Sequence, residues 1–230
     1  MNTIKSISLI FPLYNDKNTV EIMITKSVKV LNKLKKKYEI IIVDDGCPQN
    51  SGKLALKIAK KFSKVKVFFH KKNLGYGSAI RTGLEKSKND WIFMTDGDNE
   101  FDVYDLPKLV RVAKYNDLVI TFRHKKIYTT YRIIISWIYN AILRLLFNTK
   151  FRDISSASRF VKKKLIKNTR LSSNSPFIGA EIAIKSKWAG YKVGEIGIHQ
   201  YPQTFRNESV SLKNIFLTIK DMILLFIRIL

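Results

Sequence analysis

The first hundred residues alternate between short β-rich runs and Lys-rich stretches with apolar residues at helical spacing. Each β-rich run leads into a polar or Gly-containing turn, which is typical of a strand that ends at the surface. Regular alternation of strand and helix favours an α/β fold, with a mostly parallel sheet covered by helices on both faces. The expected strands are residues 7–11, 39–43, 65–69 and 91–95, and the expected helices are 20–36, 53–62 and 78–86.

The second half of the chain is less regular. Here we expect a strand over 117–122, helices over 131–147 and 176–188, a strand over 193–198 and a last helix over 211–230. We find no internal repeat and no low-complexity linker, so a single domain with a C-terminal extension is the simplest division.

The composition is strongly basic, with 42 Lys and Arg against 18 Asp and Glu in 230 residues. Such a surface attracts phosphates, whether on nucleic acid, lipid or nucleotide, and net charge alone does not indicate which of these three ligands the protein binds.

Cys47 is the single cysteine, which suits a reducing compartment. The N-terminus enters a strand-like run without a signal-peptide pattern, and no apolar run reaches the roughly 20 residues that span a bilayer, so we expect a cytoplasmic protein.

An acidic turn follows the fourth expected strand, with the sequence Asp-Gly-Asp-Asn-Glu-Phe-Asp at 96–102. Carboxylates one residue apart at a strand end share a small volume, where a divalent cation such as Mg²⁺ or Mn²⁺ relieves their repulsion. A plain turn that caps the next helix is the alternative, and Asp-x-Asp by itself does not decide between the two. A calcium loop of the EF-hand type requires Gly where Phe101 stands, so that version is excluded.

The other strand ends carry polar residues too. Asp44 and Asp45 could accept hydrogen bonds from a ribose or a base, or could cap the helix that begins near Ser51. Gly75 and Gly77 permit close approach of a ligand to the backbone, or simply shape a turn. Because ligands of parallel sheets bind beyond the carboxyl ends of the strands, one shared site explains these motifs better than separate local roles.

Taken together, the motifs resemble those of the family 2 glycosyltransferases, which have the GT-A fold. The resemblance rests on Pro-Leu-Tyr-Asn-Asp at 12–16, Val-Asp-Asp-Gly at 43–46, Asn-Leu-Gly-Tyr-Gly at 73–77 and the acidic turn at 96–102. It implies a nucleoside-diphosphate sugar as donor and a metal held by Asp98 and Glu100, although many relatives have Gln at the latter position. The residues expected around the donor nucleotide are Pro12, Tyr14, Asp16, Asp44, Asp45, Gly75 and Asp96.

The second half resembles, more loosely, the dolichyl-phosphate mannosyltransferase-like branch of this family. The resemblance implies that Arg123, Arg132 and Ser136 bind the phosphate of a polyprenyl-phosphate acceptor, and that Arg206 lies near the donor diphosphate. The Gly-x-Ser-Lys segment that usually follows such an arginine is absent. We therefore expect a catalytic domain over 1–210, with a donor half to about 117 and an acceptor half from 118.

Two expected helices are unusually apolar. On 131–147 the polar residues Arg132, Ser136, Asn140 and Arg144 form one narrow stripe, so the helix is either buried with its stripe facing the site or lies in a membrane interface. For a single helix, burial is the usual outcome. The helix over 211–230 has charged interruptions that disfavour a spanning segment. We interpret it as interfacial, with peripheral membrane association, and a dimer interface is the alternative.

The implied reaction is inverting sugar transfer, with Asp98 and Arg132 among the catalytic residues. An ionised lipid phosphate needs no general base. A sugar hydroxyl as acceptor would need a general base, and Glu181 is the candidate unless it is only an exposed helix residue.

A nucleic-acid-binding module is the alternative from another class of protein. The acidic strand edge would repel a phosphate backbone, so we expect no nucleic acid as partner.

Overall fold

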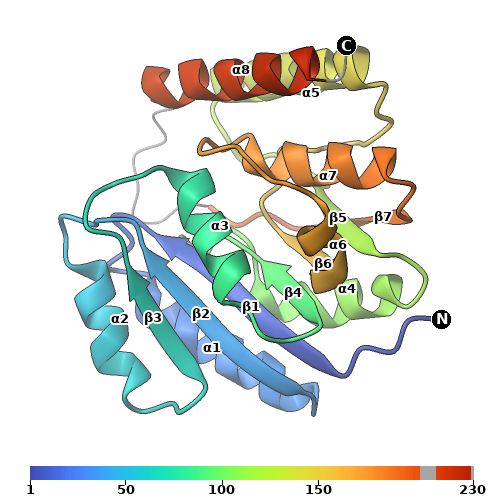
Figure 1. Ribbon diagram of the computed structural model, residues 1–230. Coiled ribbons are helices and arrows are strands. Elements are labelled where there is room, and N and C mark those ends of the chain that lie inside the picture. Colours follow the sequence, from blue (N-terminus) through green and yellow to red (C-terminus); the bar gives the residue numbers. More distant parts are fainter. Residues whose placement is uncertain (203–210, 229–230) are drawn as a thin grey trace.

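Seven strands form one sheet in the computed structural model, which describes residues 1–202 and 211–228 (Figure 1). Their order across the sheet is β3-β2-β1-β4-β6-β5-β7, so strands from both halves of the chain belong to the same sheet. The strands are β1 Ser6–Leu13, β2 Lys37–Asp44, β3 Val65–Phe69, β4 Trp91–Met94, β5 Leu118–Arg123, β6 Arg159–Lys162 and β7 Val193–Ile198.

The sheet is mostly parallel, as the sequence predicted. Among the seven strands described, only β6 runs antiparallel, between β4 and β5, and we did not expect a strand at these residues. The other pairs are parallel, so the carboxyl ends of β1, β2 and β4 lie at one edge of the sheet. The polar motifs that follow these strands therefore share that edge.

Helices cover both faces because alternate strand residues point to opposite sides. Leu9 and Phe11 belong to a core with α1, α2 and α4, whereas Ile10 packs on the other face with α3, α5, α6, α7 and α8. A 3₁₀ turn over 103–105 leads into α4, and neither α4 nor α6 was predicted. The helices are α1 Val20–Lys33, α2 Ser51–Ala59, α3 Tyr76–Lys86, α4 Leu106–Ala113, α5 Thr130–Phe147, α6 Lys163–Asn168, α7 Ile178–Trp188 and α8 Leu212–Ile227.

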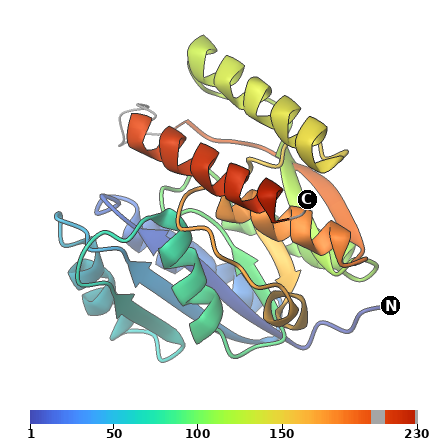
Figure 2. The ribbon, with the colours of Figure 1, turned by 45° about the horizontal axis from the view of Figure 1, so that its top comes forward.

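Helices α5 and α8 lie on the same side of the molecule, beyond α7 (Figure 1 and Figure 2). Within α5 only Asn140, Leu143 and Phe147 are buried, whereas Leu145 is 83% exposed and Trp137 65% exposed. Burial of the whole helix, the usual outcome for such a sequence, is therefore wrong for most of its apolar residues, with Leu143 and Phe147 as exceptions. The polar stripe turns inward and most of the apolar surface turns outward.

No helix among residues 1–202 and 211–228 combines the length and the apolar character needed to cross a membrane.

Candidate active site

The acidic turn begins two residues beyond β4, at the carboxyl edge of the sheet. Asp98 accepts a hydrogen bond at Oδ1 from the Glu100 amide over 3.0 Å, and Asn99 between them has a left-handed φ of 61°. Gly97 passes so close to β1 that an added Cβ would lie 2.6 Å from the Pro12 carbonyl oxygen. The turn is thus folded tightly against the end of β1, with its carboxylates gathered at one place.

These carboxylates crowd one another. Burial, followed by the negative charge of Asp98, raises the pKa of Asp96 to about 7, and Glu100 and Asp16 add to the effect. Burial and Asp98 likewise raise the pKa of Glu100. A positive charge at this position would relieve the repulsion and take the place of a proton, so the electrostatics favour a bound cation.

Glu100 offers a cation an available ligand atom. Its side chain is only 3% exposed, and its Oε1 is buried without a hydrogen-bond partner among the described residues. Its Oε2 accepts from the Tyr128 hydroxyl over 2.8 Å and from Gln200 Nε2 over 3.1 Å. The same residues contain no preformed cluster of three or more His, Cys, Asp or Glu. One or two carboxylates completed by water and substrate phosphate is the arrangement that Mg²⁺ and Mn²⁺ sites commonly use, so the residues fit the predicted metal.

The segment after β1 closes one side of the turn. Asp16 accepts a hydrogen bond at Oδ2 from the Tyr14 amide over 3.0 Å, and its carbonyl accepts from the amides of Thr19 and Val20 at the start of α1. The Thr19 hydroxyl donates to the Gly97 carbonyl over 2.7 Å. The structure therefore brings the motif at 12–16 to the acidic turn, as predicted, although donor contacts of these residues stay a prediction.

The two acids at the end of β2, Asp44 in its last position and Asp45 directly after it, have distinct local roles. Asp44 accepts from the Gly52 amide over 2.6 Å and from the Cys47 amide over 2.7 Å, so it caps α2, which was the alternative interpretation. Asp45 accepts from the amides of Leu74 and Gly75 and contacts His70 Nδ1 over 2.7 Å. It thereby ties the end of β2 to the glycine turn. Contact of either acid with the donor stays a prediction.

The glycine turn at 75–77 packs against backbone from the second half of the chain. Gly75 has a φ of +99°, and a Cβ there would lie 2.6 Å from the Asn174 carbonyl, which accepts a hydrogen bond from the Gly77 amide over 2.9 Å. Tyr76 between them donates its hydroxyl to Asp96 Oδ1 over 2.8 Å. Sequence reasoning missed Tyr76, although it stands inside a motif that we singled out.

Arg123, at the end of β5, is held by a buried ion pair that the sequence did not predict. Its Nε and Nη2 donate to the two carboxylate oxygens of Asp153 over 2.6 and 3.0 Å, and Nη2 also donates to Ser155. Burial would raise the pKa of Asp153, but hydrogen bonds and charge from Arg123 outweigh it and hold the pKa well below its usual range. The arginine is therefore locked in one orientation.

The other predicted acceptor residues lie on the inward stripe of α5. Ser136 accepts a hydrogen bond from Lys126 Nζ over 2.6 Å, and the Arg132 guanidinium carbon lies 3.7 Å from the centre of the Tyr128 ring. Tyr128 also accepts from Arg123 Nη1 over 3.1 Å. Burial and Asp98 raise the pKa of Glu100, and the charges of Arg132 on α5 and Arg123 on β5 oppose this, so both arginines lie near the Glu100 carboxylate. Lys126 and Tyr128 were not predicted, because single residues in a polar loop have no periodicity to mark them.

Glu181 is fully buried on α7, so the interpretation as an exposed helix residue is wrong. Its oxygens accept hydrogen bonds from the Ser172 and Ser173 amides and from Lys185 Nζ. Burial opposes ionisation, but Lys185 and Ser173 outweigh it and lower the pKa of Glu181. These contacts favour a role in fixing the 172–175 segment over proton abstraction. Arg206 lies outside the described residues.

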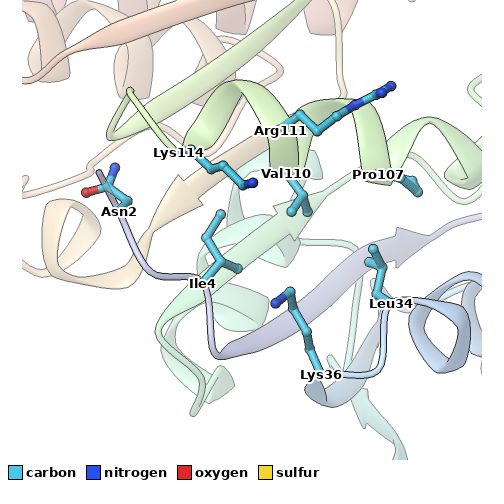
Figure 3. Close-up of a pocket in the computed structure, with 8 residues that line it drawn as sticks. All are labelled: Asn2, Ile4, Leu34, Lys36, Pro107, Val110, Arg111 and Lys114. Atoms are coloured by element: carbon cyan, nitrogen blue, oxygen red, sulfur yellow. The ribbon is translucent and has the colours of Figure 1, made fainter.

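A separate cavity of about 480 Å³ lies at the amino ends of β1 and β2 (Figure 3). The position is remote in the fold from the carboxyl edge that carries the acidic turn. None of the described residues that line it belongs to the predicted site: Asn2, Ile4, Leu34, Lys36, Pro107, Val110, Arg111 and Lys114.

Comparison with known proteins agrees with this geometry. A family model described as glycosyl transferase family 2 matches residues 8–170. A human dolichyl-phosphate beta-glucosyltransferase is 35% identical over 112 residues, which are 46% of this chain and 35% of that protein. An undecaprenyl-phosphate 4-deoxy-4-formamido-L-arabinose transferase from Yersinia pestis is 26% identical over 223 residues, covering 96% of this chain and 67% of that protein. The chain therefore spans about a third of the human relative and about two thirds of the bacterial one.

Solved structures show the same fold. Glucosyl-3-phosphoglycerate synthase from Mycobacterium tuberculosis, crystallised with Mn²⁺, uridine diphosphate and phosphoglyceric acid, superposes with a TM-score of 0.70 at 17% identity. The match covers 95% of this chain and 76% of that chain. The α/β sheet with its flanking helices is thus the GT-A fold, as expected.

Proposed function

Because the chain belongs to glycosyl transferase family 2, we propose that it transfers a sugar from a nucleoside-diphosphate sugar to a polyprenyl phosphate at the cytoplasmic face of a membrane. The named relatives support this choice of acceptor, since one is a dolichyl-phosphate and the other an undecaprenyl-phosphate sugar transferase. The orientation of α5 is the observation that carries the proposal. It turns Arg132, Ser136 and Asn140 toward the site and leaves its apolar residues outside, which suits an acceptor with an anionic head and a hydrocarbon tail.

The residues divide the reaction between two sides of the site. On the donor side, a divalent cation held by Asp98 and Glu100 would neutralise the leaving diphosphate. On the acceptor side, Arg132, Ser136 and Lys126 bind the lipid phosphate, and Arg123, fixed by Asp153, keeps positive charge beside it. The phosphate oxygen attacks the anomeric carbon as the bond to the diphosphate breaks, inverting that carbon. No general base is required, since a phosphate monoester is ionised near neutral pH.

An acceptor screen tests this function. Purified protein is incubated with UDP- and GDP-sugars in the presence of Mn²⁺ and either a short prenyl phosphate, the corresponding prenol or a saccharide. We expect transfer to the prenyl phosphate only. Arg132→Gln should raise the KM for the prenyl phosphate about tenfold, because a charged hydrogen bond contributes about 1.5–3 kcal/mol. Transfer to saccharide alone, or an unchanged KM in this variant, would contradict the proposal.

Membrane association is proposed from the outward faces of α5 and α8. Phe216 on α8 is 68% exposed, and the α8 segment also carries Lys213, Lys220 and Arg228, which favour anionic headgroups. The Phe147 and Phe226 rings, 6.0 Å apart, join the two helices, so their exposed residues act as one surface. A pair of neighbouring apolar helices with flanking cations is typical of a protein that rests in a lipid interface.

Placing negative charges on this surface should weaken lipid binding strongly without unfolding the protein. In the double variant Leu145→Glu and Phe216→Glu we expect binding to anionic vesicles to fall more than tenfold, because burying each apolar side chain is worth about 1.5–3 kcal/mol. Cosedimentation with vesicles measures the loss. Leu56→Glu, at a 45% exposed position on α2, is the matched control that should bind normally. Unchanged vesicle binding combined with loss of a dimer in light scattering would show that the surface is a subunit interface instead.

A further inference from the structure

Tyr128 lies in the loop between β5 and α5 and contacts both sides of the site. Its hydroxyl donates to Glu100 Oε2 over 2.8 Å and accepts from Arg123 Nη1 over 3.1 Å. One hydroxyl group therefore bridges the Glu100 carboxylate of the acidic turn and Arg123, which lies beside the proposed acceptor-phosphate site. Both of its hydrogen-bonding roles are used in this bridge, which fixes the direction of its proton.

The ring of Tyr128 makes a second, independent contact. The Arg132 guanidinium stacks over its face, with the carbon 3.7 Å from the ring centre, while that of Arg123 lies 5.4 Å away. A guanidinium over a tyrosine face is attracted by the ring and restricted in orientation. The ring thus aligns the α5 arginine that is proposed to bind the acceptor phosphate.

The bridge also determines how Glu100 faces a cation. Oε2 is engaged by Tyr128 and Gln200, so the carboxylate plane is fixed, and Oε1, which has no hydrogen-bond partner within residues 1–202 and 211–228, is the oxygen available to a metal. Groups that orient a metal-binding side chain in this way commonly change metal affinity about 10- to 100-fold when removed.

From these contacts we propose that Tyr128 is a positioning residue that couples the cation site to the acceptor-phosphate site. A shift of Tyr128 moves the Glu100 carboxylate and the Arg132 guanidinium together, so filling one site orders the other. By thermodynamic linkage the effect is reciprocal: the cation tightens acceptor binding by the same factor as the acceptor tightens cation binding. This inference rests on the proposed function, because it takes Glu100 as a metal ligand and Arg132 as a phosphate ligand.

Two substitutions separate the hydroxyl from the ring. Tyr128→Phe keeps the stack on Arg132 and removes the bridge, whereas Tyr128→Leu removes both. Titration calorimetry with Mn²⁺ and with geranyl phosphate, each alone and each in the presence of the other, measures the affinities and their coupling without any turnover. Tyr115→Phe, at a residue 65% exposed beyond α4, is the matched control, and thermal melts verify that each variant is folded.

In the wild type we expect each ligand to tighten the other about fivefold or more. Tyr128→Phe should weaken Mn²⁺ binding about tenfold, leave geranyl phosphate binding without metal within about twofold, and reduce the coupling to about one. Tyr128→Leu should weaken geranyl phosphate binding without metal as well.

The outcomes distinguish this inference from the proposed function. Wild-type protein that binds both ligands with a coupling that persists in folded Tyr128→Phe would overturn the role of Tyr128 alone, since direct attraction between cation and phosphate would then explain the coupling. Wild-type protein that binds no Mn²⁺, or binds it equally well after Asp98→Ala, would overturn the proposed cation site and this inference with it.

Discussion

Replacing Asp98 with alanine is expected to lower the rate of sugar transfer about a thousandfold. Burial, followed by the negative charge of Asp98, raises the pKa of both Asp96 and Glu100, so a bound cation would relieve repulsion to which the Asp98 carboxylate contributes. Losing the charge that holds a cation there removes about 4 kcal/mol of stabilisation of the departing diphosphate, and about 1.4 kcal/mol corresponds to a factor of ten in rate.

The loss is measured as kcat for transfer to a short prenyl phosphate at saturating Mn²⁺. Asp102→Asn is the control, since it removes the same charge from the same turn at a residue that pairs with Lys26. That variant should retain a rate within a few-fold of the wild type. An Asp98→Ala protein as active as the Asp102→Asn protein would refute the catalytic role of the acidic turn.

Replacing Asp153 with leucine is expected to lower the melting temperature by about 10 °C. The carboxylate and the Arg123 guanidinium are about 95% buried as a bidentate pair, and removing one partner of such a pair costs about 3–5 kcal/mol. For a chain of this size, each kcal/mol corresponds to about 2–4 °C. Because the folded-state pKa of Asp153 is depressed, the pair contributes its full stabilisation above the ordinary aspartate pKa and loses it progressively as the pH falls from there toward the lower folded-state pKa.

A double variant separates stability from acceptor binding. Arg123→Met combined with Asp153→Leu replaces both charges with apolar groups and should recover part of the lost stability, because the Arg123 guanidinium is no longer buried without its partner. The recovery is partial because Lys126, whose Nζ lies 3.5 Å from Asp153 Oδ1, loses that partner too. The double variant should still bind prenyl phosphate more weakly than the wild type does. Lys108→Ala, which breaks a pair with Asp105 at a 43% exposed lysine, should change the unfolding free energy by no more than about 0.5 kcal/mol. An Asp153→Leu protein that melts like the wild type would contradict the structural role of the pair.

The carboxyl edge of the sheet, where the donor is proposed to bind, could be predicted because its polar residues directly follow strands. Once β1, β2 and β4 are recognised as parallel, the segments containing Asp16, Asp45 and Asp98 must lie at one edge, and the structure brings them there. It was harder to predict from the sequence whether an acid in these segments caps a helix or contacts a ligand. A helix cap and a ligand contact require the same residue types, so the sequence did not reveal that Asp44 caps α2.

The residues on the proposed acceptor side were harder to predict from the sequence, because the fold there depends on a short strand, on the orientation of α5 and on contacts distant in the chain. β6 has only four residues and includes the buried Arg159, which a period-two pattern of apolar residues cannot detect. The periodicity of α5 identified its polar stripe but not which side faces the protein, since a helix in lipid reverses the usual rule. Tyr128 bonds Glu100, which is 28 residues away in the chain, and Asp153 bonds Arg123, which is 30 residues away, so no local pattern marks these contacts.

We propose that the acidic turn binds a nucleoside diphosphate through a divalent cation. Titration calorimetry of UDP and GDP, with Mn²⁺ or with EDTA, tests this binding most directly. We expect at least one of these nucleotides to bind ten or more times more tightly with Mn²⁺, and Asp98→Ala to abolish the difference. Equal affinity in Mn²⁺ and EDTA, or a metal effect that survives in Asp98→Ala, would contradict it.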